Sequence, residues 1–218
     1  DKMFTVLKSL ILEILFPSFC PLCKTKVNES GAWCDECLAF SVQKLKITAV
    51  ELKYLDKCLI LCHYQEGVNK IIKGLKYYNQ LKYCDNILWL LNRLEVVKAY
   101  ANIDIVVPVP LSAKRFSERG YNQSEKMYKP WALEHNLNWQ NLLIRIKETK
   151  PQYQLNLKER KENLKNAFNV KKDFCIKGKN ILLVDDVYTT GSTLAECAKV
   201  LKKAGAKEVR AVALAINI

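Results

Sequence analysis

The stretch from Ile181 to Leu194 constrains the fold of this chain more than any other, because it predicts a strand, a loop and a helix in succession. Ile181–Val184 is a short apolar run that stops at two acids, which is typical of a fully buried central strand. The apolar spacing that follows predicts a helix ended by Gly205. The residues between strand and helix therefore belong where ligands bind in open α/β sheets, at the carboxyl end of a strand.

The loop after this strand has the composition of an anion cradle. Gly191 lets the backbone approach a ligand closely, and the N-terminus of the following helix favours a negative charge. Hydroxyl groups surround this glycine, at Thr189, Thr190, Ser192 and Thr193. The loop is therefore a candidate site for a phosphate group.

The two acids that precede the loop, Asp185 and Asp186, suit a different partner. Carboxylates accept hydrogen bonds from sugar hydroxyls or hold a divalent cation beside a phosphate. An apolar strand, two acids and Thr-Thr-Gly-Ser-Thr together resemble the phosphoribosyl diphosphate (PRPP) signature of type I phosphoribosyltransferases. The other interpretations are a receiver strand of a response regulator and an ordinary Ser/Thr helix cap. A receiver carries its acidic pair early in the domain, whereas few residues follow Asp186.

A second strand-end loop lies upstream. Ile103–Val107 reads as another buried strand, and Pro108-Val-Pro-Leu111 follows it. Basic residues come next, at Lys114, Arg115 and Arg119. Guanidinium groups pair bidentately with phosphate oxygens, so we expect these residues to contact the diphosphate of PRPP.

Two Cys-x-x-Cys pairs near the N-terminus, Cys20 with Cys23 and Cys34 with Cys37, predict a four-thiolate zinc site. A closed site of four sulfurs is structural, because it leaves no position for a substrate. The alternative is a thiol redox pair, which usually occurs singly at a helix start. The other cysteines show no ligand spacing and are expected to be small core residues: Cys58, Cys62, Cys84, Cys175 and Cys197.

The formal net charge of +13 suits polyanionic partners, including a diphosphate, nucleic acid or anionic lipid, without choosing among them. Residues 65–78 predict a helix with Val68, Ile71, Ile72 and Leu75 on its apolar side and Lys70, Lys73 and Lys76 on the other. Tyr77, Tyr78 and Tyr83 follow. Basic and aromatic residues together either stack bases and hold phosphates or cover a hydrophobic seam.

The ends of the chain and its middle carry weaker signals. Residues 3–16 predict a short helix that either docks on the protein or contacts a membrane. Lys8 and Glu13 interrupt its apolar run, which argues against a cleavable signal, and the run is too short to span a membrane. We therefore expect a cytoplasmic protein without stable membrane insertion, in which clustered cysteines bind metal. Residues 141–168 predict either a mobile flap or a solvated connector, and Lys207–Ile216 predicts a return strand parallel to Ile181–Val184.

The motifs together resemble the ComF family, whose members join a zinc-finger segment to a phosphoribosyltransferase-like domain. The resemblance rests on the cysteine pairs, Pro108-Val-Pro-Leu111, Arg119-Gly-Tyr-Asn-Gln-Ser124, the Asp185 to Thr193 stretch, and Thr149, Gln152, Arg160, Asn163 and Phe168. It implies an α/β fold with a parallel sheet flanked by helices. It also implies that Asp185 and Asp186 contact ribose or Mg²⁺, that Thr189–Thr193 bind the 5′-phosphate, and that Lys114, Arg115 and Arg119 bind the diphosphate.

The expected organisation is a zinc-binding segment over residues 1–45 and a phosphoribosyltransferase-like domain over residues 46–218, with a hood (46–100) and a core sheet (101–218). The family implies a role in DNA uptake and natural transformation, with single-stranded DNA and a helicase or another competence protein as partners. Two hypotheses remain open. One is a phosphoribosyltransferase that acts on PRPP with Mg²⁺, and the other is a non-catalytic DNA-binding module on the same scaffold.

Overall fold

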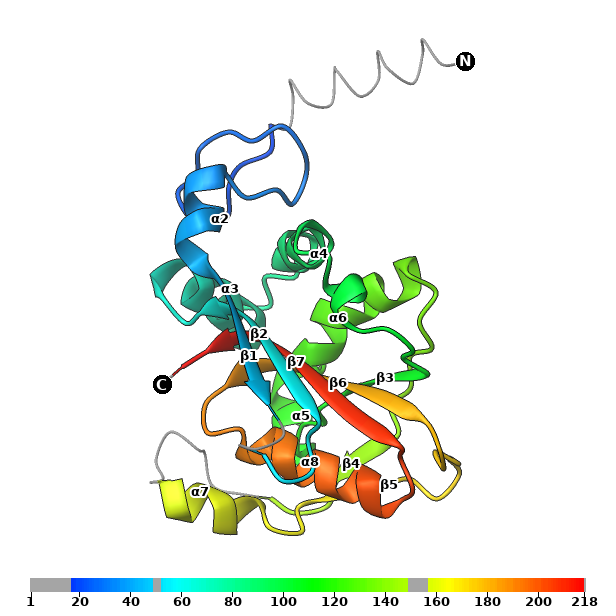
Figure 1. The fold of residues 1–218 in the computed structure, drawn as a ribbon. Coiled ribbons are helices and arrows are strands. Elements are labelled where there is room, and N and C mark those ends of the chain that lie inside the picture. Colours follow the sequence, from blue (N-terminus) through cyan, green and yellow to red (C-terminus); the bar gives the residue numbers. More distant parts are fainter. Residues whose placement is uncertain (1–16, 49–51, 149–156, 218) are drawn as a thin grey trace.

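The structure is a computed structural model that describes residues 17–48, 52–148 and 157–217. Its centre is a five-stranded sheet with the strand order β1-β2-β7-β6-β3 (Figure 1). These strands span Val42–Thr48 (β1), Lys57–His63 (β2), Ile105–Pro108 (β3), Asn180–Tyr188 (β6) and Glu208–Ile216 (β7). Two short strands, Leu143–Arg145 (β4) and Phe168–Val170 (β5), form a separate antiparallel pair.

The strands β2, β7, β6 and β3 run parallel, whereas β1 is antiparallel to β2. β6 pairs with β7 from Asn180 to Tyr188, which confirms the predicted return strand. On its other side β6 pairs with β3, so that Pro108 lies opposite Val184. The carboxyl ends of β3 and β6 therefore meet at one edge, with the loops that follow them side by side.

β6 extends further than its apolar run predicts. The sequence predicts that the strand stops at the two acids and that a turn begins at Tyr188, but pairing with β7 continues through that residue, opposite Ile216. Aspartate has a low intrinsic strand propensity, which the ladder with a nine-residue neighbour overrides. Asp185 and Asp186 are consequently held on strand backbone.

Helices cover both faces of the sheet (Figure 1). One face packs against α3 (Glu66–Tyr77), α4 (Tyr83–Arg93) and α6 (Gln123–Glu134), in an apolar cluster that includes Leu182 and Val184. The other face packs against α8 (Ser192–Lys203), in a second cluster that includes Leu183. The other helices in the described ranges are α2 (Asp35–Ser41), the 3₁₀ helix η1 (Val96–Ala99), α5 (Ala113–Arg119) and α7 (Leu157–Leu164).

α3 confirms the predicted amphipathic helix except at one residue. Its predicted apolar positions, Val68, Ile71, Ile72 and Leu75, are each 1% exposed. Lys70 and Lys73 are exposed as expected. Lys76 instead turns toward the sheet, where its side chain is only 20% exposed, because the carboxylate of Asp186 attracts its ammonium.

Some predictions concern residues outside the described ranges. These are the helix over residues 3–16 and the positions Thr149, Gln152 and Leu155 of the segment predicted as a flap or connector. The described parts of that segment form β4, α7 and β5. Across residues 17–48, 52–148 and 157–217, every helix is too short or too polar to cross a membrane.

Candidate functional site

The loop between β6 and α8 is shaped around Gly191. This glycine has a φ of +70°, and a Cβ atom there would lie 2.7 Å from the hydroxyl oxygen of Tyr188. The loop thus requires glycine both for its backbone conformation and for space. Beside it, the hydroxyl oxygens of Thr190 and Ser192 lie 2.8 Å apart in a hydrogen bond. The result is a compact, hydroxyl-lined turn that leads into the amino-terminal end of α8, which favours an anion.

Asp185 and Asp186 form a buried acidic pair just before this loop, 8% and 5% exposed. Asp185 Oδ1 accepts hydrogen bonds from the backbone N–H of Asp186 (2.9 Å) and from the hydroxyl of Ser124 on α6 (3.3 Å). The hydroxyl of Tyr128 donates to the backbone carbonyl of Asp185 at 3.2 Å. α6 therefore fixes the orientation of the first acid through two side chains.

The pKa of Asp185 is raised to about 7, first because burial penalises its charged form and second because Asp186 lies beside it. The hydrogen bond from the Asp186 N–H and the ammonium of Lys76 lower this pKa but do not cancel the effect of burial. A second positive charge at the pair, such as a divalent cation, would favour the ionised form.

Asp186 is the centre of a chain of contacts. Its Oδ2 accepts a hydrogen bond of 2.7 Å from Gln123 Nε2 and forms an ion pair with Lys76 Nζ at 2.7 Å. Gln123 Oε1 in turn accepts a hydrogen bond from the guanidinium of Arg119. Burial lowers the pKa of Arg119, while Asp186 acts to raise it. α3 and α6 thus contact this carboxylate directly, and α5 is joined to it through Gln123.

The three predicted diphosphate contacts differ in position. Arg119 is joined to the acidic pair through Gln123, and its guanidinium lies 5.8 Å from the ring centre of Tyr77. Arg115 is half-buried. Lys114 is exposed, and its backbone N–H donates to Glu148 Oε1 at 3.1 Å. The structure therefore brings Arg119 close to the acidic pair, whereas Lys114 lies on the surface.

Sequence reasoning missed the partners of the acids: Lys76, Gln123 and Ser124. Gln123 and Ser124 belong to the Arg119-to-Ser124 motif, yet nothing in its composition shows that α6 begins there and points both side chains at β6. Lys76 carried no comparable signal, since Lys73 follows the buried Ile72 in the same way and is exposed.

A cavity of about 610 Å³ borders the strand-end loop of β3. Its lining includes Pro110, Leu111 and Phe116 on one side and Leu143 and Arg145 on the other. Asp185 and Asp186 are not part of this lining, so the cavity is separate from the acidic pair.

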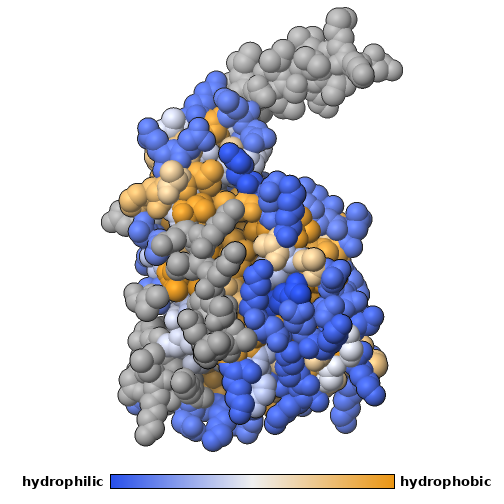
Figure 2. Space-filling view, in the orientation of Figure 1, coloured by the Kyte–Doolittle hydropathy of each residue, from blue (hydrophilic) through white to orange (hydrophobic). Residues whose placement is uncertain are grey.

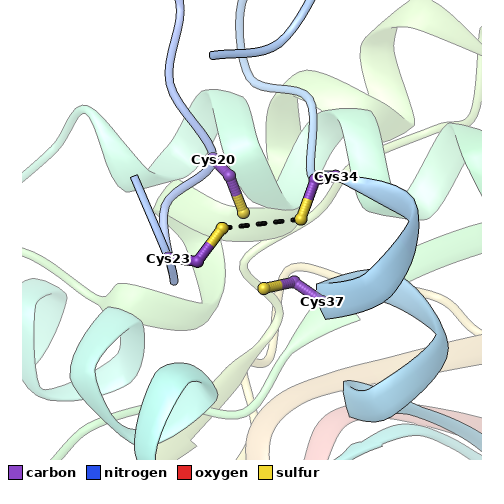
Figure 3. Close-up of side chains that lie close together, drawn as sticks. All are labelled: Cys20, Cys23, Cys34 and Cys37. Carbon is purple, nitrogen blue, oxygen red and sulfur yellow. Dashed lines mark hydrogen bonds between the residues drawn. The ribbon is translucent and has the colours of Figure 1, made fainter. Parts of the chain in front are cut away.

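The cysteine module (residues 17–41) brings both Cys-x-x-Cys pairs together, as Figure 3 shows. The sulfur atoms of Cys20, Cys23, Cys34 and Cys37 all lie within 4.8 Å of one another. Tetrahedral zinc with Zn–S bonds of about 2.3 Å needs sulfurs roughly 3.8 Å apart, so the spacing fits the metal. Hydrogen bonds with Thr25 are the main reason that the pKa of Cys23 is lowered to about 6, whereas burial is the main reason that the pKa of Cys37 is raised.

Backbone hydrogen bonds shape each half of this cluster. The N–H of Cys20 donates to the Thr25 carbonyl, and the N–H of Lys24 donates back to the Cys20 carbonyl. Cys34 directly precedes α2, and its backbone carbonyl accepts a hydrogen bond from the N–H of Leu38 in the first turn of this helix. The predicted four-cysteine cluster is confirmed, and its geometry is compatible with structural zinc.

The remaining cysteines mostly behave as predicted. Cys58, Cys62 and Cys197 are buried, and burial raises the pKa of each thiol. Cys84 is half-buried. Cys175 is exposed, so its prediction as a core residue is wrong. It lies in the turn after β5 that leads to β6, where the chain runs over the surface.

The cysteine module packs directly on the hood helices. A Cβ atom on Gly67 of α3 would lie 2.5 Å from the Leu22 side chain, and one on Gly31 would lie 2.6 Å from the carbonyl oxygen of Asp85. Figure 2 shows hydrophobic residues gathered below the module, whereas most of the lower part of this face is hydrophilic. The module is consequently an integral part of the hood side of the molecule.

Comparison with known proteins gives the same fold and a family. Residues 145–217 match the family model of the phosphoribosyl transferase domain, which covers β6, the loop and β7. A solved structure of adenine phosphoribosyltransferase from Leishmania tarentolae is 14% identical, with a TM-score of 0.41, over 73% of this chain and 91% of that one. The predicted phosphoribosyltransferase-like sheet with flanking helices is confirmed by the domain match and the strand order.

Two curated relatives extend over most of the chain. The DNA utilization protein YhgH of Escherichia coli K12 is 30% identical over 88% of this chain and 82% of its own length. Competence protein F of Haemophilus influenzae is 34% identical over 94% of this chain and 93% of its own length. Identity at this level over nearly the whole of both sequences shows that the chain belongs to the ComF family.

Proposed function

We propose that this protein binds PRPP with Mg²⁺ at the acidic pair and the following loop, and that it acts in DNA uptake. The observation that carries the proposal is the position of Asp185 and Asp186, buried on strand backbone directly before a glycine-centred, hydroxyl-lined turn. A sugar phosphate needs such a pair of neighbouring sites, one for its phosphate and one for its ring hydroxyls.

Different residues of the site would bind different parts of PRPP. In this proposal, Asp185 and Asp186 accept hydrogen bonds from the ribose hydroxyls, and the backbone N–H groups and hydroxyls of Thr189–Thr193 bind the 5′-phosphate. Lys114, Arg115 and Arg119 bind the diphosphate. The position of Arg119 supports this division, because it already reaches the acidic pair through Gln123.

The donor set fits magnesium, since two neighbouring carboxylates supply the oxygen ligands that this cation takes together with phosphate oxygens. A magnesium ion held by Asp185 and Asp186 would supply positive charge that offsets the charge of the diphosphate. In the corresponding transfer, the C1–O bond to diphosphate breaks, an oxocarbenium-like ribose forms, and a nucleophile bonds to C1 while diphosphate leaves. The carboxylates of the pair would stabilise the positive charge that develops on the ribose.

The names of the relatives support the biological assignment. Competence protein F and the DNA utilization protein YhgH are named for roles with DNA, and the family link extends over nearly the whole chain. We therefore assign this protein to DNA uptake and natural transformation. A helicase or another competence protein as partner is proposed from the family resemblance, and the cytoplasm from the sequence. Structural zinc at the four cysteines completes the assignment. The phosphoribosyl transferase domain match favours a PRPP site over a purely DNA-binding scaffold.

Single-stranded DNA is the proposed macromolecular partner. Tyr77 and Tyr78, at the end of α3, are 68% and 70% exposed, and Arg119 lies against the first of them. Exposed rings beside basic groups stack successive bases and hold their phosphates. Fluorescence anisotropy with a labelled oligonucleotide should show affinity that falls steeply with salt. Tyr78→Ala should weaken binding and Phe40→Ala, an equally exposed ring on the cysteine module, should not.

Thermal unfolding tests the PRPP site. A ligand at one hundred times its dissociation constant stabilises the folded state by about 2.7 kcal/mol, so Mg²⁺ with PRPP should raise the Tm of the wild type. Asp186→Asn should lose this shift. Asp173→Asn removes the same charge from an exposed position and should keep it. A wild type whose Tm does not respond to Mg²⁺ with PRPP contradicts the proposed function.

A further inference from the structure

The ammonium of Lys76 lies beside the buried acidic pair, where a positive charge stabilises the carboxylates. Its Nζ lies 2.7 Å from Asp186 Oδ2, and the two side chains are only 20% and 7% exposed. Exposed ion pairs are worth little, but this one is largely shielded from water and forms a charge-assisted contact. In the described part of the chain Asp185 has no ion-pair partner of its own, so one ammonium faces two adjacent carboxylates.

The end of α3 is built to hold this ammonium in place. Three consecutive residues of its last turn each contact the segment from α5 to α6 or the acidic pair. The carbonyl of Leu75 accepts a hydrogen bond from the hydroxyl of Tyr121, Lys76 binds Asp186, and the ring of Tyr77 lies against Arg119. The side chain of Lys76 is therefore positioned by its neighbours on both sides.

The contacts of Asp186 show what a divalent cation would meet. Gln123 Nε2 and Lys76 Nζ both bind Oδ2, at 2.7 Å each. The amide of Gln123 is neutral and can remain beside a metal-bound carboxylate, whereas the ammonium of Lys76 would lie close to a second positive charge. Two cations at one carboxylate oxygen repel each other, so the metal and the ammonium compete.

We propose that Lys76 is the positioning residue of the acidic pair, an internal cation that competes with the metal for Asp186 and moves to a phosphate oxygen of the ligand when the metal binds. The proposal rests on the proposed PRPP site and adds a residue to it. The ammonium keeps the pair partly neutralised in the free protein. With Mg²⁺ and PRPP bound, the ligand offers anionic oxygens within reach of a flexible four-carbon stem.

Replacement of the ammonium should therefore change two affinities in opposite directions. Lys76→Met keeps the length of the side chain and removes its charge. We expect it to bind Mn²⁺ alone about tenfold more tightly, because the competing cation is gone, and Mg²⁺ with PRPP about tenfold more weakly, because one charge-assisted contact is lost. If Lys76 had a merely structural role, Lys76→Met would weaken the binding of Mn²⁺ and of PRPP alike. Lys76→Arg, which keeps the charge, should restore part of the PRPP affinity.

The experiment uses zinc-loaded full-length protein, so that Mn²⁺ reports on the acidic pair. Electron paramagnetic resonance measures free Mn²⁺, and calorimetry measures PRPP binding in the presence of Mg²⁺. Lys73→Met, an exposed lysine one turn earlier on α3, is the matched control and should behave as the wild type in both. If Lys76→Met does not fold, Lys76→Gln replaces it, since its amide still donates to Asp186.

The Mn²⁺ measurement tests competition at Asp186, and the PRPP measurement tests transfer of the ammonium to the ligand. Mn²⁺ affinity of the Lys76 variant that equals or falls below that of the wild type overturns competition at Asp186. PRPP affinity that stays at the wild-type level overturns the transfer of the ammonium to the ligand. A wild type that binds no PRPP contradicts the proposed function and with it this transfer, and the Mn²⁺ measurement then decides the competition by itself.

Discussion

The indole N–H of Trp33 donates a hydrogen bond of 3.1 Å to the backbone carbonyl of Asn86, and the Asn86 side chain returns one of 2.9 Å to the carbonyl of Gly31. Trp33 is 3% exposed and Asn86 9%, so the first bond is buried and the second is partly shielded from water. They join the cysteine module to α4. α4 packs beside α3, whose last turn reaches Asp186. The four-cysteine cluster and the candidate PRPP site are thus connected through two packed helices.

Loss of the metal should therefore destabilise the chain. Purified protein should contain about one zinc per chain, and Cys37→Ser should lose the metal, because three thiolates hold zinc far less well than four. The Tm should fall with the metal content. Metal analysis and thermal unfolding check both effects. Cys175→Ser alters an exposed cysteine outside the cluster and should keep metal and Tm, and equal zinc in the two variants would refute the four-cysteine assignment.

Docking of the module can be tested without touching a cysteine. Gly31 and Gly178 both have left-handed backbone, with φ of +81° and +75°. A Cβ atom on Gly31 would lie 2.6 Å from the Asp85 carbonyl oxygen, whereas one on Gly178 meets nothing within 4 Å. Both alanine variants carry a conformational cost of about 1–2 kcal/mol. Gly31→Ala should lose clearly more stability in urea unfolding, and equal losses would mean that the module does not pack on α4 as described.

The buried acid should make stability depend on pH. The pKa of Asp185 is about 7 in the folded chain, against about 3.9 in an unfolded one. A carboxyl group whose pKa is higher when folded contributes its full stability below pH 4 and loses it as the pH rises to 7. Without added Mg²⁺, Asp185→Asn should therefore be more stable than the wild type at pH 8.

The advantage of this variant should shrink as the pH falls from 7 toward 4, and each 1 kcal/mol corresponds to about 2–4 °C in Tm for a chain of this size. Thermal unfolding across this pH range is the measurement. Asp173→Asn, at an exposed position, should track the wild type throughout. An Asp185→Asn variant that is less stable than the wild type at every pH would contradict the raised pKa.

The strand-loop-helix around Asp185 could be predicted from sequence because its signals are local. An apolar run, two acids and a glycine among hydroxyls define β6, the loop and α8 within a short stretch. The cysteine cluster could be predicted for the same reason, since each pair has the Cys-x-x-Cys spacing and the two pairs lie close together in the sequence. Neither prediction required knowledge of a distant contact.

Lys76 and Gln123 could not be predicted because their roles depend on contacts between distant elements. Lys76 has the spacing of a surface lysine on an amphipathic helix, and only the carboxylate of Asp186 draws it inward. Gln123 starts α6 far from β6 in sequence. The extension of β6 through the acids had the same origin, since it depends on pairing with β7. In each case tertiary contact overrode a local pattern.

Replacement of Gly191 by alanine should impair ligand binding by the loop after β6. Alanine at Gly191 places a Cβ atom 2.7 Å from the hydroxyl oxygen of Tyr188 and strains a φ of +70°. The cradle should distort, so PRPP affinity in the presence of Mg²⁺ should fall at least about tenfold, as expected for the loss of several phosphate contacts. Gly178→Ala has a similar φ and no clash, and should bind normally. Calorimetry on the two variants compares them, and an unchanged affinity for Gly191→Ala would remove the loop from the site.

The central claim, that the acidic pair forms a PRPP site, is tested most directly by calorimetric titration of zinc-loaded wild-type protein with PRPP in the presence of Mg²⁺, repeated on Asp185→Asn and Asp173→Asn. The account predicts saturable binding at one site per chain in the wild type and in Asp173→Asn, and none in Asp185→Asn, although that variant is the more stable fold. Equal binding by all three proteins, or no binding by the wild type, would contradict it.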